Sequence, residues 1–327
     1  MRLMNFAFTI IPKMIRAALR PIRRRALWLI VMLFAINNNY AASTTEIAFI
    51  GNTQSETQQR LVDKTRKHLK QHNVDVALKL LSLRTDLHLI NNNTDYDLLI
   101  PIGSDSTGQL LDKGITSPQL SIFTPSMPYN KMVPNDNPLH SAIFFNQPAS
   151  RYLELIKTIT SLNNTVSLIY SDYSESFHNQ LQDAAKQQEI PLIGKKISDS
   201  DELYKALDEI LEQGGVLLAL PDPTIYNRRS IKTIFLTSYQ RGIPIIGFSE
   251  SYTKAGAIAS IHSNLGDIAL QLSETIIHFI ENGQTLPPKA YPRYFHISSN
   301  IKVARSLGIT LDDNEEITKK IIEMEQQ

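Results

Sequence analysis

The sequence contains no cysteine among its 327 residues. Disulfide bridges, thiolate zinc sites, iron–sulfur clusters, a cysteine nucleophile and a lipid-modified N-terminal cysteine are therefore excluded. Glycine is sparse, with 13 residues, and no stretch matches the GxGxxG or GxxxxGK[ST] patterns that cradle nucleotide phosphates. We expect no cofactor, and binding must rely on oxygen and nitrogen groups.

No charge of either sign dominates the whole chain, which has 33 basic and 32 acidic residues. The charged residues are distributed unevenly, because residues 1–42 hold seven basic residues and no acidic one. The remainder has 26 basic against 32 acidic residues, a formal charge of −6. An acidic body lacks the broad positive field that nucleic acid requires, so we expect no nucleic-acid partner.

The sequence also lacks an apolar run long enough for an ordinary membrane span, which needs about 20 residues. Its longest candidate, residues 26–36, follows Arg23, Arg24 and Arg25 and precedes the small polar stretch NNNYAAS. A basic flank, a short apolar run and a small-residue exit are the parts of a secretory signal. We predict that residues 1–42 form a signal peptide and that the body is periplasmic. The alternatives are an uncleaved anchor and a true start at Met14.

Beyond residue 43, short β-branched runs alternate with amphipathic segments, the pattern of parallel sheets covered by helices. Strands are predicted at 46–51, 74–81, 97–102 and 119–123, and one helix at 55–71. Residues 125–138 hold four prolines and are predicted to form a long loop. A second series follows, with strands at 142–145, 166–171, 190–194, 215–220 and 243–248, and helices at 150–161, 176–188, 201–213 and 228–241. The predicted fold class is α/β, with two doubly wound lobes and parallel sheets.

Enzyme signatures are mostly absent. GFSES at 247–251 has Ser249 where a nucleophile elbow would place its serine, but Ser251 stands where that motif needs glycine. A hydrolase using Ser249 would also need a nearby histidine, and His262 is the one candidate. His68 and His72 are four residues apart on a predicted helix, but the lysines around them favour a solvated face over a metal site. We expect neither an enzyme nor a metal site.

Polar residues stand at the predicted strand ends, where ligands bind in open α/β sheets. They follow the strands of both series, and the serine, threonine and aspartate residues among them are also ordinary helix caps. The candidate ligand-binding residues chosen on this ground are Ser104, Asp105, Thr124, Tyr170, Ser171, Asp222 and Ser249.

Several segments between residues 147 and 309 resemble the ABC-transporter substrate-binding family that includes the tryptophan- and tyrosine-type components. The matching pieces are QPASRYLELIKTI, VSLIYSDYSES, GIPIIGFSESYTKAGAIAS and ISSNIKVARSLGI. The resemblance implies a periplasmic-binding-protein-like (type I) fold with hinge crossovers. It divides the chain into a first lobe of residues 43–145 plus 263–291 and a second lobe of residues 146–262 plus 292–327. Such a protein closes its lobes on a small solute and passes it to a membrane permease.

Carried over by position, the family's tyrosine turn falls on Tyr170 and Ser171, its acidic residue on Asp222, its strand-end serine on Ser249 and its final-segment asparagine on Asn300. Its GAIAS crossover falls on 256–260, and its first-lobe ligand loop on GNTQS at 51–55. Family members usually have an asparagine close after the acidic residue, whereas here Pro223 follows Asp222 and stiffens the turn. We expect Asp222 to bind ligand through its carboxylate, the alternative being a helix cap.

The resemblance implies an exported small-solute-binding protein of an ABC-type uptake system. The hydroxyls and carboxylates suit an amino-acid-like or other small polar solute, and Tyr170, Tyr173 and Tyr226 could stack on an aromatic part. The expected partners are the solute and a membrane permease or receptor, and we expect a monomer. The alternative is a sensor or accessory protein with the same fold, read by a protein partner. Neighbouring permease and ATPase genes would favour transport, and a neighbouring receptor gene would favour sensing.

A signal peptide at residues 1–42 predicts that the exported protein is cleaved near Ala41 or Ala42. Intact-mass measurement of the protein recovered outside the inner membrane should give a chain without Trp28. A mass that still includes Trp28 would show that the segment stays attached as an anchor.

Overall fold

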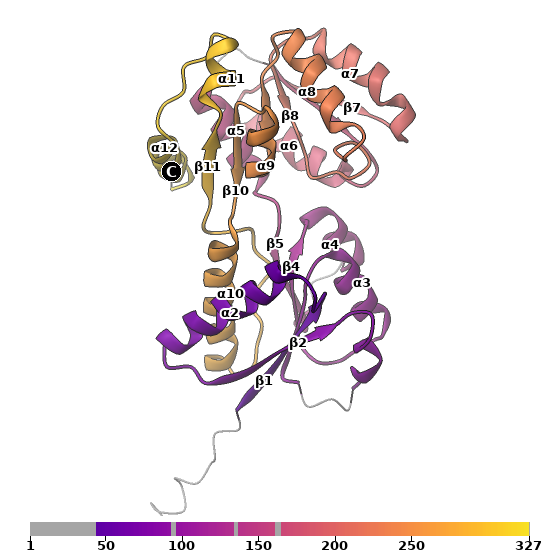
Figure 1. Ribbon diagram of the computed structural model, residues 1–327, viewed down its shortest axis with the longest axis vertical. Coiled ribbons are helices and arrows are strands. Elements are labelled where there is room, and N and C mark those ends of the chain that lie inside the picture. The colour runs from indigo at the N-terminus through magenta and orange to yellow at the C-terminus, as the bar shows by residue number, and fades with distance from the viewer. Residues whose placement is uncertain (1–43, 93–95, 134–136, 161–164, 327) are drawn as a thin grey trace, which may run out of the picture. The chain divides into compact units, whose positions relative to one another are not determined.

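The computed structural model describes residues 44–92, 96–133, 137–160 and 165–326. Residues 45–327 form one compact unit, which contains two separate β-sheets (Figure 1). The predicted signal peptide at 1–42 lies outside the described residues. Within the described part of the chain, no helix is both long and apolar enough to cross a membrane.

The first sheet and the helices that share its core make up what we call the first lobe. Its strands have the order β2-β1-β3-β4-β5, and every pair in it is parallel. The elements of the first lobe are β1 (Thr45–Gly51), α2 (Glu56–Gln71), β2 (Val76–Ser82), a 3₁₀ turn (Leu87–Leu89), β3 (Leu98–Pro101), α3 (Ser104–Asp112), β4 (Gln119–Thr124), α4 (Ser126–Met132), β5 (His140–Phe144) and α10 (Leu265–Glu281).

Helices cover both faces of this sheet because both faces of its strands are apolar. Along β1, Ile47 and Phe49 point into a core shared with α2 and α10, whereas Ala48 and Ile50 point into a core shared with α3. Successive side chains of a strand face opposite sides, so one apolar run fills two cores. The helix α10, far away in sequence, lies beside α2 (Figure 1).

The second sheet and its helices make up the second lobe, with strand order β11-β10-β9-β8-β6-β7. All its pairs are parallel except β10–β11. The elements of the second lobe are α5 (Ala149–Ile159), β6 (Val166–Tyr170), α6 (Glu175–Gln187), β7 (Leu192–Lys196), a 3₁₀ turn (Ser200–Glu202), α7 (Leu203–Leu211), β8 (Val216–Leu218), α8 (Ile231–Gln240), β9 (Ile245–Gly247), α9 (Glu250–Ala255), β10 (Ala259–His262), β11 (His296–Ser299), α11 (Ile301–Ser306) and α12 (Asn314–Glu325).

Three chain segments run between the two lobes, and hydrogen bonds join them. Gln147, before α5, donates from Nε2 to Ser263 Oγ at 3.0 Å, and Ser263 Oγ donates to the Tyr294 carbonyl at 2.5 Å. The Arg151 guanidinium, on α5, donates to Gln147 Oε1 at 2.6 Å and to the Pro292 carbonyl at 2.8 Å. Its other nitrogens pair with both carboxylate oxygens of Glu325 at 2.6 and 2.9 Å.

The predicted fold class is confirmed, since the structure has two mostly parallel sheets with helices on both faces. The loop predicted at 125–138 is wrong in part, because α4 occupies Ser126–Met132. Pro125 is its N-cap and Pro128 lies in its first turn, where proline's missing N–H costs no hydrogen bond.

Two further predictions need correction. The strand predicted at 142–145 exists as β5, but it pairs with β4 and closes the first sheet, as the lobe division at residue 145 implied, and does not open the second series. The crossover expected at 256–260 is instead the turn after α9 and the start of β10, since Ala259 and Ser260 are buried and pair with β9. Small residues suit that strand because Ser260 Oγ and Tyr252 lie tightly against Gly247. The antiparallel β11 was not predicted.

Truncating α10 should destabilise the protein through the first-lobe core. Leu272 is fully buried among residues of α2 and the first sheet, so Leu272→Ala should lower the free energy of unfolding by about 2–5 kcal/mol. Chemical denaturation measures the change, and Glu281→Ala, at the exposed end of the same helix, should stay within about 0.5 kcal/mol of the wild type. Equal stability of the two variants would contradict this packing.

Candidate functional site

Strand order reverses at one place in each sheet. In the first sheet, β1 lies between β2 and β3; in the second, β6 lies between β7 and β8. The crossovers on either side of such a point leave in opposite directions, so a crevice opens at the carboxyl ends of the two strands. The residues that follow β1 and β3, and those that follow β6 and β8, are therefore the ones to inspect.

A hollow of about 530 Å³ lies at the reversal point of the first sheet. Its lining comes from the ends of three strands: residues 51–54 and Gln58 after β1, residues 82–85 after β2, and Ile102, Asp105 and Ser106 after β3. Arg84 and Asp105 are both exposed and carry opposite charges. The hollow therefore offers a cation, an anion and several amide and hydroxyl groups to a small polar molecule.

Two glycines shape this hollow. Gly103, between β3 and α3, has φ of 87°, a left-handed conformation that favours glycine and lets the chain turn directly into the helix that carries Ser104 and Asp105. At Gly51, a Cβ atom would lie 2.2 Å from Gln58 Oε1. That oxygen accepts the Asn52 N–H at 2.6 Å, so the absence of a side chain at position 51 lets the Gln58 amide hold the loop.

Asp222 lies at the reversal point of the second sheet and is buried, with an exposed fraction of 1%. Its Oδ2 accepts hydrogen bonds from Ser171 Oγ and Ser174 Oγ, both at 2.6 Å, and from the Ser171 N–H at 3.2 Å. Its Oδ1 accepts the Thr224 N–H at 2.9 Å, which closes a turn of its own backbone. The carboxylate therefore joins the loop after β6 to the loop after β8.

Tyr173 connects the two reversal points. Its backbone N–H donates to Ser171 Oγ at 3.2 Å, and its phenol lies near Ser104, at the start of α3. Burial raises the pKa of the Tyr173 phenol, the nearby Ser104 hydroxyl lowers it, and the negative charge of Asp222 raises it. The structure therefore brings together Ser104, Ser171 and Asp222 of the predicted set, with Tyr173 between them.

The remaining predicted residues lie in other surroundings. Thr124 is fully buried, and its hydroxyl lies 3.1 Å from Thr107 Oγ1. Tyr170 stacks on His178, with ring centroids 3.9 Å apart. Asn300 caps α11 by accepting the Val303 N–H, and its amide donates to the Thr253 carbonyl.

The hydrolase arrangement is not formed in the described part of the chain. Ser249 is the N-cap of α9, and no hydrogen bond joins it to His262. His262 Nε2 instead lies 2.8 Å from Ser298 Oγ. Burial lowers the pKa of His262. Among the described residues no group of three or more histidine, aspartate or glutamate side chains could hold a metal ion.

Arg84 and Gln58 line the hollow but were not among the predicted residues. The strand-end rule that selected Ser104 and Asp105 could have found Arg84, because it follows the predicted strand 74–81 by three residues. Gln58 could not be found in this way, since it belongs to the first turn of α2 and reaches back only through the folded loop.

A family model described as ABC transporter substrate binding protein matches residues 50–323. Among solved structures, a domain in complex with L-Trp from Streptococcus pneumonia is 16% identical, has a TM-score of 0.60, and covers 85% of this chain and 98% of its own. A conserved domain protein from Vibrio cholerae is 19% identical, with a TM-score of 0.60 and coverages of 85% and 98%. A ligand-free, open substrate-binding protein with adhesive properties from Clostridium difficile is 16% identical, with a TM-score of 0.67 and coverages of 83% and 97%. No curated protein matches the chain.

Removing the charge of Asp222 should cost stability even without ligand. In Asp222→Asn, one carboxylate oxygen becomes an NH₂ group, so either the Ser171 or the Thr224 N–H loses its acceptor. The free energy of unfolding should fall by about 1–3 kcal/mol, measured by chemical denaturation. Asp172→Asn is the control, because Asp172 is exposed and pairs with Lys196 only at the surface, so its stability should stay close to that of the wild type. An Asp222→Asn protein as stable as the wild type would refute the structural role.

Proposed function

The chain belongs to the ABC transporter substrate-binding protein family, and from this we propose that it is an exported protein that binds an amino-acid-like or other small polar or aromatic solute. It binds without catalysing a reaction. Its two lobes, residues 43–145 plus 263–291 and 146–262 plus 292–327, close on the solute in the periplasm. The protein acts as a monomer and delivers the solute to a membrane permease, or to a receptor if closure serves sensing.

The observation that carries the ligand class is the pair of opposite charges in one hollow. Arg84 and Asp105 both line the crevice at the β1/β3 reversal point. A guanidinium binds a carboxylate through paired hydrogen bonds, and a carboxylate binds an ammonium group. An amino acid carries both groups on one carbon, so the hollow suits an amino-acid-like molecule better than a neutral sugar.

The second lobe supplies hydroxyls and an aromatic face. Asp222 holds Ser171 and Ser174 in place, and the Tyr173 phenol stands next to that cluster. An apolar or aromatic side chain of the solute can pack on the Tyr173 ring. The pneumococcal structure of the same fold contains L-Trp, an amino acid with an aromatic side chain, which supports including aromatic amino acids among the candidates.

Closure couples the solute to the conformation because the ligand gains contacts from the second lobe only when the lobes meet. In this proposal the first lobe recognises the charged groups, and closure brings the polar edge of the second lobe over them. The permease then distinguishes the loaded protein by its closed form.

A thermal-shift screen should identify the ligand. Amino acids including L-Trp, polyamines, nucleobases and sugars are each added to the protein, and a true ligand raises the melting temperature because it binds only the folded state. Under this proposal an amino acid, not a sugar, gives the largest rise. Stabilisation by a sugar alone would refute the ligand class.

Charge removal in the hollow then tests the site with the ligand found. Arg84→Gln and Asp105→Asn should each weaken binding by about 1.5–3 kcal/mol, measured by calorimetry, because each removes a charged hydrogen-bond partner. Asp112→Asn makes the same chemical change at the exposed end of α3, outside the hollow, and should leave the affinity unchanged. Equal losses in all three variants would point to a general charge effect.

A further inference from the structure

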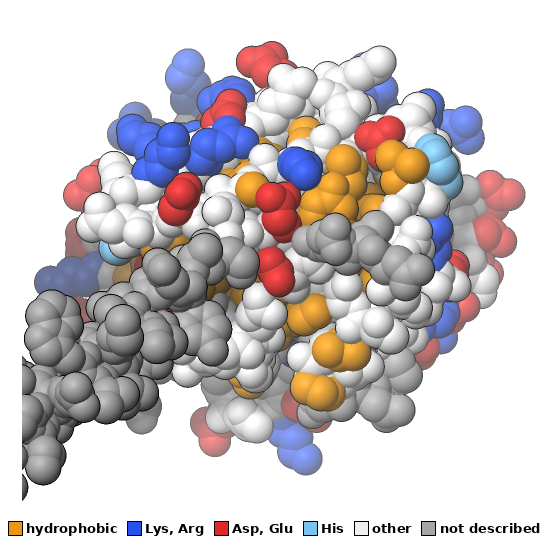
Figure 2. Space-filling view, turned by 90° about the horizontal axis from the view of Figure 1, so that it is seen from below, with side chains coloured by type: hydrophobic (Ala, Val, Ile, Leu, Met, Phe, Trp, Pro, Cys, Tyr) orange, Lys and Arg blue, Asp and Glu red, His pale blue; other side chains and the backbone are white. Residues whose placement is uncertain are grey.

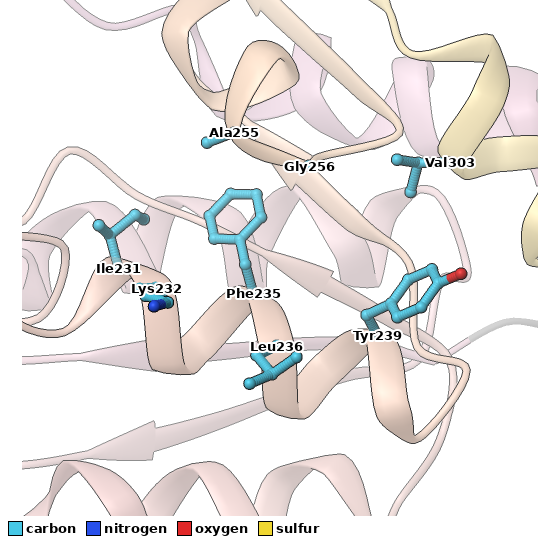
Figure 3. A pocket seen from close by; sticks show the side chains of 8 residues that line it. All are labelled: Ile231, Lys232, Phe235, Leu236, Tyr239, Ala255, Gly256 and Val303. Carbon is cyan, nitrogen blue, oxygen red and sulfur yellow. The ribbon is translucent and has the colours of Figure 1, made fainter.

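An apolar groove of about 480 Å³ lies on the second lobe, away from the strand ends described above. Phe235, Leu236 and Tyr239 of α8 form one wall, and Ala255, Gly256 and Val303 form the other (Figure 3). Phe235 approaches Gly256 so closely that a Cβ atom there would lie 3.0 Å from its ring. The groove is therefore built by tight contact between α8 and the turn after α9.

Large apolar side chains stand exposed at this groove. Leu236 is 52% exposed and Tyr239 48%, and both line the groove. Lys232, Leu236 and Tyr239 are spaced four and three residues apart, so they share one face of α8. Exposed apolar side chains that adjoin a groove are typical of binding surfaces.

The unpaired charges on the segments that form the groove have one sign. Residues 228–242 include four basic and no acidic residue, and residues 300–309 include two basic and no acidic residue. Arg241 pairs with Asp208, and Lys254 on α9 pairs with Glu250 at 2.7 Å. The other five cations are exposed and form no ion pair within the described residues: Arg228, Arg229, Lys232, Lys302 and Arg305.

We propose that this basic apolar face, defined by α8, the turn after α9, and α11, docks onto an anionic lipid bilayer. Five unpaired cations spread over two helices and the turn before α8 are more than one small anion could contact, whereas a charged membrane surface meets them together. Leu236 can enter the interface, and Tyr239 suits its amphipathic boundary.

The charge of the remaining body supports this orientation. Beyond residue 42 the chain carries a formal charge of −6, although this face is basic. An anionic membrane therefore attracts the face and repels much of the remaining surface. The proposal does not depend on the identity of the solute, because the groove lies outside both reversal points.

Tryptophan reporters test the docking at the level of single positions. Trp28, the sole tryptophan, lies in the predicted signal peptide, so the processed chain gives a background without tryptophan emission. In that background, Tyr239→Trp should shift to shorter wavelength with vesicles of phosphatidylcholine and phosphatidylglycerol, and should not shift with phosphatidylcholine alone. Tyr204→Trp is the matched control, because Tyr204 is 56% exposed on α7 beside mixed charges. No shift at position 239, or an equal shift at 204, would overturn the proposal.

Charge variants test the electrostatic part with the same reporter. Each basic residue near an anionic surface strengthens binding to the membrane about fivefold. The triple variant Arg229→Gln, Lys232→Gln, Lys302→Gln should therefore bind the vesicles roughly a hundredfold more weakly. The control removes the same charge from α2 of the first lobe, through Lys64→Gln, Lys67→Gln and Lys70→Gln. Figure 2 shows several Lys and Arg side chains gathered on one part of that lobe. Helix α2 holds five Lys and Arg against two Asp and Glu, so this control tests whether a basic surface without exposed large apolar side chains binds equally well. These controls should change binding by less than about threefold, and unchanged melting temperatures would confirm folding.

Equal losses in the two triple variants would overturn the proposal, since net charge alone would then explain binding.

A poly-glutamate peptide serves as a further probe. A Tyr239→Trp shift with that peptide but none with anionic vesicles would identify an acidic protein partner in place of a membrane. Loss of vesicle binding in high salt is the expected behaviour of the membrane-docked form.

Discussion

The reversal of strand order in each sheet is the constraint on which the candidate site depends. A parallel sheet buries both faces under helices, so polar side chains can gather only at its edges and ends. In the first sheet the reversal between β1 and β3 opens the hollow that holds Arg84 and Asp105. In the second sheet the same reversal between β6 and β8 brings Ser171 next to Asp222. The site thus follows from topology before any individual side chain is considered.

The two reversal points use their polar groups differently. In the first lobe, the charges of Arg84 and Asp105 stay exposed to solvent, where a ligand can replace water. In the second lobe, Asp222 is buried and its oxygens are occupied by hydroxyl and N–H groups of its own lobe. A buried carboxylate needs such partners because an unpaired charge there would cost several kcal/mol. One lobe therefore exposes its charged groups to solvent, and the other holds its carboxylate buried within a hydrogen-bonded cluster.

Arg151 connects the lobes to the C-terminal helix. It is 7% exposed, lies over the Phe295 ring at 4.2 Å, and bonds to Gln147, the Pro292 carbonyl and Glu325. Breaking a buried ion pair by removing one partner typically costs about 3–5 kcal/mol. Because Gln147 also bonds to Ser263, this one guanidinium holds all three connecting segments in register. A movement of the lobes must therefore bend residues near this cluster, and α12 stays coupled to it.

The sequence by itself determined the fold class, because period-two and helical apolar patterns report burial locally. The helix predicted at 55–71 begins one residue after Ser55, its N-cap, and ends at Gln71. The sequence also selected Ser104, Ser171 and Asp222, since a strand end can be recognised without knowing the strand's neighbours. Pairing is not local, however. Whether residues 142–145 closed the first sheet or opened the second depended on which strand they met, and periodicity carries no information on that choice.

Tertiary structure alone decided how the selected residues combine. Ser171 and Asp222 are 51 positions apart, and only the adjacency of β6 and β8 places a hydroxyl on the carboxylate. Thr124 and Asn300 occupy equally plausible strand or helix ends, yet one hydroxyl meets Thr107 in the interior and the other side chain caps α11. The basic apolar face likewise needs α8 and α11, some sixty residues apart, to lie together. Contacts of this kind arise when elements distant in the sequence pack together, so no short segment of the sequence is sufficient to predict them.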